Sequence, residues 1–157
     1  MKRIKVLSCI ATFAVMALIF FFSSQTATVS SETSSGITRK IAEIIAAIAG
    51  SEDDESIRHF LHVIVRKAAH FTLFFMLALS VANTVWQLFK AEKMKLLLGT
   101  LAFCLFYAIA DEVHQMFVPG RAAMFIDVII DFCGALCGCG LFIIIFCLYK
   151  RRKCRDL

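Results

Sequence analysis

The stretch DEVHQMFVPGR, residues 111–121, decides how this 157-residue chain folds, because it places charged and polar side chains where a long apolar run ends. Ionisable side chains beside membrane-length apolar segments are costly unless they find partners. Within about three helical turns, the stretch holds five charged or polar side chains, namely Asp111, Glu112, His114, Gln115 and Arg121. It therefore predicts a polar cluster that the rest of the chain positions.

Helical spacing predicts how the members of this stretch are placed. Asp111 is four residues before Gln115 and three before His114, so these three side chains share one face of a helix. The Pro-Gly pair that follows ends the helix and favours a turn. This turn is expected to direct Arg121 back toward the acids at the helix end.

The composition is that of a membrane protein. Hydrophobic residues make up 60% of the chain, and the mean hydropathy is +0.80, whereas ordinary soluble domains are roughly 45–50% apolar. A spanning helix needs about 20 apolar residues, and four runs approach this length, at 6–22, 68–89, 96–113 and 123–149. We therefore predict an all-α fold, an integral membrane four-helix bundle, formed as one domain over residues 1–157.

The first apolar run allows two interpretations. Lys2, Arg3 and Lys5 precede it, as basic residues precede the apolar part of a signal peptide. The polar residues after it offer only a poor Ala-x-Ala cleavage site. We therefore expect a retained membrane anchor in preference to a cleaved signal peptide.

The long segment 23–67 is expected to form an outer loop that contains helical parts. Its isoleucines within residues 37–49 lie near helical spacing, which predicts a short amphipathic helix on the membrane surface. Ser51 precedes four acidic residues, a pattern typical of a helix N-cap and first turn. A second helix is expected to open there and to continue into the second span.

The distribution of basic residues predicts the orientation. Of the 17 Lys and Arg residues, about eleven lie at the two chain ends and in the short segment 90–95. By the positive-inside rule, both termini are predicted to be cytoplasmic in a multi-pass protein of the cell membrane. Basic residues grouped at span ends, without one patch of interleaved aromatics, also argue against nucleic acid as a partner.

Two further helices are expected to bring polar side chains to the same membrane depth. Arg66 and Lys67 lie four and three residues before His70, so the three share a helix face. Asp127 and Asp131 are four residues apart near the start of the last span. Cations from one helix are thus expected to face carboxylates from the others near the outer leaflet.

This predicted cluster has a functional and a structural interpretation. In the functional one, an outward-facing site binds or modifies an anionic, lipid-linked component of the cell envelope. Catalysis by proton transfer is assigned to His70, Asp111, Glu112, His114 and Asp127. Substrate binding is assigned to Arg66, Lys67, Gln115, Arg121 and Asp131. In the structural one, the same groups form a buried network that fixes helix packing, and the protein is a non-enzymatic module that acts through a protein partner.

Metal binding is considered for the same cluster. Imidazole and carboxylate groups suit zinc or manganese, and the cluster offers four of them, in His70, Asp111, Glu112 and His114. Their spacing matches no close ligand motif, so no metal site is predicted. The sequence identifies no cofactor.

Two glycines in the last span indicate close packing of helices. Gly134 and Gly138 form a Gly-x-x-x-Gly pattern, which presents a small-residue face to a neighbouring helix. Such a face predicts tight helix packing. One form of this packing is a homo-oligomer in which copies of the chain pack through Gly134 and Gly138.

With these residues in place, the chain resembles the VanZ-like family of small bacterial membrane proteins over most of its length. The resemblance rests on Ser23-Ser24-Gln25, Lys67-x-x-His70-Phe71, Asp111-Glu112-x-His114-Gln115, Pro119-Gly120-Arg121, and Asp127 followed by Gly134 and Gly138. It implies a membrane protein associated with cell-envelope traits, among them low-level teicoplanin resistance in the family's namesake, without a settled reaction. The chain departs from the family's usual residues at two positions, because Asp131 stands where asparagine is usual and Phe74 where many members have tyrosine.

Overall fold

The computed structural model describes residues 2–26, 36, 40 and 55–155. Apart from residue 40, the predicted amphipathic helix over residues 37–49 lies outside the described residues, and so does the predicted N-cap at Ser51. The fold below refers to the described part of the chain.

The described chain is all-α, as predicted, and contains no strand. Its four long helices are α1 (Lys2–Ser23), α3 (Glu55–Phe89), α4 (Lys93–Gln115) and α5 (Phe125–Arg155). The first three helices contain the apolar runs predicted to span the membrane, whereas α5 begins two residues after the start of the predicted run 123–149 and extends beyond its end. Residues 55–67, which precede the second predicted span, continue that span as part of α3.

All four helices are long and apolar enough to cross a membrane, with mean hydropathies of 1.6 to 2.5 over their most apolar stretches. Large apolar side chains cover the outside of the bundle, and Phe13, Phe60 and Phe106 are each more than 60% exposed. Contiguous apolar surface of this extent is rare on soluble monomers and is the expected surface toward lipid. The chain is therefore a multi-pass membrane protein.

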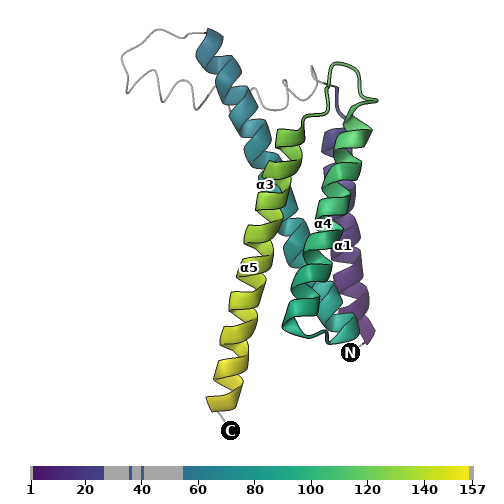
Figure 1. Cartoon of the computed structure of the whole chain (residues 1–157), viewed down its shortest axis with the longest axis vertical. Coiled ribbons are helices and arrows are strands. Elements are labelled where there is room, and N and C mark those ends of the chain that lie inside the picture. The colour runs from purple at the N-terminus through teal and green to yellow at the C-terminus, as the bar shows by residue number, and fades with distance from the viewer. Residues whose placement is uncertain (1, 27–35, 37–39, 41–54, 156–157) are drawn as a thin grey trace, which may run out of the picture.

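The helices are arranged so that both chain ends lie at the same end of the bundle (Figure 1). α3 packs most closely against α5 and next against α1, and α4 packs mainly against α5 and α3. The connection between α4 and α5 lies at the opposite end of the bundle from the N- and C-termini. The last turns of α1 and α4 and the first turns of α5 consequently meet at this far end.

The contact between α3 and α5 depends on the two glycines of the predicted small-residue face. A Cβ atom at Gly134 would overlap the backbone carbonyl oxygen of Phe71, and one at Gly138 would overlap that of Phe75. The prediction of close helix packing is confirmed, and the packing is between helices of one chain. A homo-oligomer through these glycines stays a prediction, and it would need a face other than the one that α3 covers.

A buried apolar core and a few polar contacts hold α1 to the other helices. Ile19, Phe74 and Leu77 are fully buried. The Tyr107 hydroxyl donates a hydrogen bond to the backbone oxygen of Met16 at 2.8 Å. Interhelical hydrogen bonds of this kind stabilise membrane bundles by about 0.6 kcal/mol each on average, so they add to the packing without dominating it.

Candidate functional site

The polar residues singled out in the sequence gather at the far end of the bundle. α3 supplies Arg66, Lys67 and His70, α5 supplies Asp127 and Asp131, and α4 with its following turn supplies Asp111, Glu112, His114, Gln115 and Arg121. The last residue of α1, Ser23, and the residue after it, Ser24, also contribute, although the sequence assigned no role to either. These residues do not form one contact network, and the contacts divide them into several groups.

The first group is centred on the Asp111 carboxylate, which is 5% exposed. Ser23 Oγ donates a hydrogen bond to Asp111 Oδ2 at 2.7 Å, and Gln115 Nε2 donates one to the same oxygen at 3.1 Å. The pairing of Asp111 with Gln115 follows from their predicted helical spacing. Ser23 was missed as a member of the site, although it begins the Ser-Ser-Gln motif that the sequence shows.

His114 belongs to a different group, because its contacts are with α1. Its Nε2 lies 3.1 Å from Ser24 Oγ, and its ring stacks on Phe20 with the ring centroids 4.7 Å apart. The donor in the Ser24 contact depends on the imidazole tautomer. His114 therefore lies between α1 and α4 with its ring half-buried.

Glu112 contacts the start of α5. Its Oε2 accepts a hydrogen bond from the backbone N–H of Met124 at 2.9 Å, directly before the first residue of the helix. The first N–H groups of a helix lack intrahelical partners, and a carboxylate there is favoured by the helix dipole. The described contact of Glu112 thus fixes α5 against α4, which is a positioning role.

Asp127 pairs with both cations of α3. It forms an ion pair with Lys67, and its Oδ2 lies 3.8 Å from Arg66 Nη2. Asp127 is in the first turn of α5, where a negative charge is stabilised by the helix dipole. The predicted meeting of α3 cations with α5 carboxylates is therefore present in the structure at this pair of helices.

Arg121 reaches its place through the predicted turn. Gly120 has a φ of 77°, a conformation that favours glycine, and the Arg121 N–H donates to the Val118 carbonyl at 3.1 Å. Arg121 Nη2 donates a hydrogen bond to the backbone oxygen of Phe22 at 3.2 Å. Burial and the nearby charge of Arg66 lower the pKa of Arg121.

The guanidinium of Arg121 has unused hydrogen-bonding capacity. Its Nε and Nη1 atoms are buried and have no hydrogen-bond partner among the described residues. Buried donors are normally satisfied, and the guanidinium fork matches the oxygens of a phosphate or carboxylate. These two nitrogens are therefore donors that the described residues leave without an acceptor.

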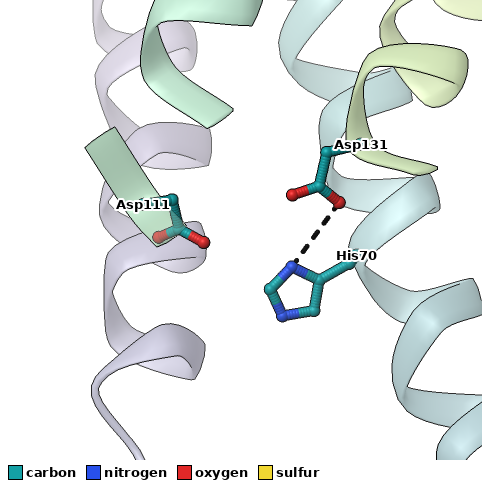
Figure 2. Close-up of side chains that lie close together, drawn as sticks. All are labelled: His70, Asp111 and Asp131. Carbon is teal, nitrogen blue, oxygen red and sulfur yellow. Dashed lines mark ion pairs between the residues drawn. The ribbon is translucent and has the colours of Figure 1, made fainter. Parts of the chain in front are cut away.

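His70 and Asp131 face each other across the α3–α5 contact, with Asp111 on the other side of the same space (Figure 2). His70 Nδ1 lies 3.6 Å from Asp131 Oδ1, and the two side chains are 10% and 0% exposed. Neither His70 Nδ1 nor either oxygen of Asp131 has a hydrogen-bond partner among the described residues. One potential ligand atom from each of the three residues lies within 4.8 Å of the others.

This cluster differs from the four side chains that the sequence suggested as possible ligands. His70 and Asp111 belong to both sets, whereas Glu112 and His114 contact other elements. Asp131, assigned to substrate binding from the sequence, takes their place. Helical spacing within one segment could not reveal this, because the three residues come from three helices.

A small pocket opens next to this cluster, between α3 and α5. Its space is that of roughly one water molecule. It is lined by Arg66, Lys67, His70, Asp127, Ile130 and Asp131. The pocket connects the ion pairs of Asp127 with the His70–Asp131 pair, so a small polar group can reach both.

Comparison with known proteins gives one finding. The family described as VanZ/LLP1 matches residues 8–146. No curated protein and no solved structure matches the chain. The matched range includes the second and third spans, most of the first and last spans, and every residue of the site described above. The match agrees with the resemblance seen in the sequence, and because it covers most of the chain, the protein belongs to the VanZ/LLP1 family.

Proposed function

We propose that this protein binds or chemically modifies an anionic, lipid-linked component of the cell envelope. The observation that carries the proposal is the guanidinium of Arg121, which holds two buried N–H-bearing nitrogens without a partner among the described residues. An oxyanion such as a phosphate would supply an acceptor for these unpaired N–H groups. The site lies at one end of the spanning helices, at the depth where the headgroup of a membrane lipid is found.

The neighbouring cations support the same class of ligand. Arg66 and Lys67 flank the small pocket and share the single carboxylate of Asp127. Their side chains are 34% and 28% exposed, so they are accessible from outside the bundle. An anion at the mouth of the pocket would meet both cations.

The orientation completes the proposal. Both termini lie at the end of the bundle opposite the site (Figure 1), and the basic residues grouped at the chain ends favour a cytoplasmic location for them. The site would then face the outer side of the cell membrane, where lipid-linked envelope components are found. A contribution to glycopeptide resistance, including teicoplanin resistance, would follow if such a component is an antibiotic target.

In a chemical reaction, the two histidines would transfer protons. His114 is half-buried between α1 and α4, and His70 lines the small pocket. Imidazole is the side chain whose unperturbed pKa best suits proton transfer near neutral pH. Glu112 and Asp127, which were assigned to catalysis from the sequence, would position α5 and the α3 cations through the contacts described above.

A second candidate is a non-enzymatic module in which the cluster only holds the helices together. The hydrogen bonds of Asp111 with Ser23 and Gln115 favour it, because all three side chains are at least 95% buried and link α1 to α4. Such a network fixes helix packing without any ligand. In that case the protein would act through a protein partner.

The test compares four variants, Arg121→Ala, Arg121→Lys, His114→Ala and the control Arg151→Ala. Arg151 is an exposed cation near the opposite end of the bundle. Each variant would be measured for thermal stability in detergent, and the envelope lipids of cells carrying it would be compared by mass spectrometry. Lysine keeps the charge of Arg121 but not its planar fork, so Arg121→Lys separates charge from bidentate binding.

The proposal expects folded Arg121→Ala and His114→Ala proteins with an altered lipid profile, and an unchanged profile for Arg151→Ala. Arg121→Lys should recover only part of the effect. A normal lipid profile in cells with folded Arg121→Ala protein would refute the proposal. Loss of stability without a lipid change specific to these variants would favour the non-enzymatic module.

A further inference from the structure

We propose that His70, Asp111 and Asp131 bind a divalent metal ion of the Zn²⁺ or Mn²⁺ class. Figure 2 shows that the imidazole and the two carboxylates face a common space between α3, α4 and α5. One nitrogen and two carboxylate oxygens form a donor set that both ions accept. Metal binding goes beyond the proposed function and is measured on the protein alone.

The separation of His70 and Asp131 suits two ligands of one ion. At 3.6 Å, Nδ1 and Oδ1 are too far apart for a hydrogen bond, which ends at about 3.2 Å. Two ligand atoms about 2.1 Å from a tetrahedral zinc ion are about 3.4 Å from each other. An ion between these two atoms therefore requires almost no movement of either side chain, whereas Asp111 moves inward to join them.

The unsatisfied atoms of the cluster are the ones that an ion would contact. The Asp131 side chain is fully buried and the His70 side chain is nine-tenths buried. Both Asp131 oxygens and His70 Nδ1 lack a hydrogen-bond partner among the described residues. Among the described residues the Asp131 carboxylate has the 3.6 Å ion pair with His70 and no hydrogen bond, and incomplete pairing of a buried carboxylate is destabilising. A bound cation would complete the pairing.

The hydrogen bonds of Asp111 orient its carboxylate for such a role. Ser23 and Gln115 both donate to Oδ2, which leaves Oδ1 as the ligand atom. Groups that hydrogen-bond a ligand from behind fix its orientation, and they are a regular part of metal sites. The buried contact between α1 and α4 would then serve the metal site as well as the packing of the two helices.

The site carries a formal negative excess before any ion binds. Four carboxylates face three Lys and Arg side chains at this end of the bundle, namely Asp111, Glu112, Asp127 and Asp131 against Arg66, Lys67 and Arg121. A divalent ion would change the formal net charge of these side chains, counted together with the ion, from negative to positive. With three protein ligands it would keep a coordination position for an anionic group. His70 would then be a ligand, and proton transfer would be left to His114.

The experiment measures metal binding to the full chain purified in detergent and stripped with a chelator. Isothermal titration with Zn²⁺ and with Mn²⁺ should show about one ion per chain. Asp131→Asn should weaken binding by more than about 100-fold, and Ser23→Ala, which removes a supporting hydrogen bond, by about 10- to 100-fold. Unfolding without metal is measured in parallel for each variant, to separate ligation from a loss of structure.

Two control variants should bind like the unsubstituted protein. Cys133→Ser/Cys137→Ser removes two exposed thiols of α5 that could bind zinc on their own. Glu92→Gln removes an exposed acid at the end of the bundle near the termini. Unchanged affinity in Asp131→Asn, or binding that the double cysteine variant abolishes, would overturn the proposal.

A spectroscopic measurement on the unsubstituted protein does not depend on how the variants fold. Co²⁺ added to the stripped protein should show the strong visible absorption of a four- or five-coordinate ion with nitrogen and oxygen ligands. A spectrum identical to aqueous Co²⁺, or one dominated by thiolate charge transfer, would refute the site. The assignment therefore remains testable even if Asp131→Asn does not fold.

Discussion

Replacement of Gly134 by alanine should destabilise the α3–α5 contact, and Gly140→Ala provides a matched control. Both glycines lie in α5. A Cβ at Gly134 would overlap the backbone carbonyl oxygen of Phe71, whereas nothing lies within 4 Å of one at Gly140. Because the obstructing atom belongs to the backbone of α3, it cannot rotate away as a side chain would, and the two helices must separate.

The magnitude follows from two opposing contributions. Alanine is favoured over glycine inside a helix by about 1 kcal/mol, and both variants receive this contribution. Inserting a methyl group into a tight contact costs roughly 1–3 kcal/mol, and only Gly134→Ala incurs it. The free energy of unfolding should therefore be lower in Gly134→Ala than in Gly140→Ala by roughly 1–3 kcal/mol, and Gly140→Ala should be at least as stable as the unsubstituted protein.

The assay is reversible unfolding in mixed micelles, by titration with a denaturing detergent and detection by the fluorescence of the single tryptophan, Trp86. Trp86 stacks edge-on against Phe146 of α5, with ring centroids 4.4 Å apart, so its emission reports on the α3–α5 contact. Equal stability of the two variants would refute the reasoning, because it would mean that the helices can separate by the width of a methyl group without cost.

Two further predictions concern the ends of the helices. Ser23→Ala removes a donor to the buried Asp111 carboxylate and should lower the free energy of unfolding by about 1.5–3 kcal/mol, whereas the neighbouring Ser24→Ala, whose side chain is exposed, should have a much smaller effect in the same titration. Gly120→Ala places a side chain on a residue with φ 77° and should cost about 1–2 kcal/mol, measured by thermal unfolding in detergent; an unchanged midpoint would contradict the assigned turn.

The helices could be predicted because their signal is local. Apolar runs of membrane length require helices, since every backbone group in lipid must be satisfied internally. The turn after α4 was equally local, because Pro119 restricts its own φ and Gly120 permits the positive φ that the turn uses. The structure confirms the all-α fold and the four membrane-length helices on these grounds.

The partners within the site could not be predicted because they depend on how helices approach one another. Helical spacing placed Asp111 and His114 on one face, and yet Asp111 contacts Ser23 while His114 contacts Ser24 and Phe20. Two neighbouring serines at the end of α1 thus separate the two residues into different groups. Nothing within the segment 111–121 specifies which residue of α1 each of them contacts.

Glu112 illustrates the same limit in another way. An acid beside a histidine in an apolar chain suggested proton transfer, which stays a prediction, and in the structure the carboxylate accepts a hydrogen bond from the backbone N–H of Met124. This partner is a main-chain group, which no pattern of side chains in the sequence can indicate. The residues whose partners lie on the same helix, such as Gln115, were the ones that spacing alone placed well.

The glycine contact between α3 and α5 also sets a distance elsewhere. Phe71, whose carbonyl oxygen abuts Gly134, is adjacent in sequence to His70, and Gly134 is one helical turn after Asp131. The contact thus fixes the distance between α3 and α5 at the level of the bundle where the His70 imidazole faces the Asp131 carboxylate. Gly134, which has no side chain, therefore sets the separation of His70 and Asp131 without contacting either side chain's charged group.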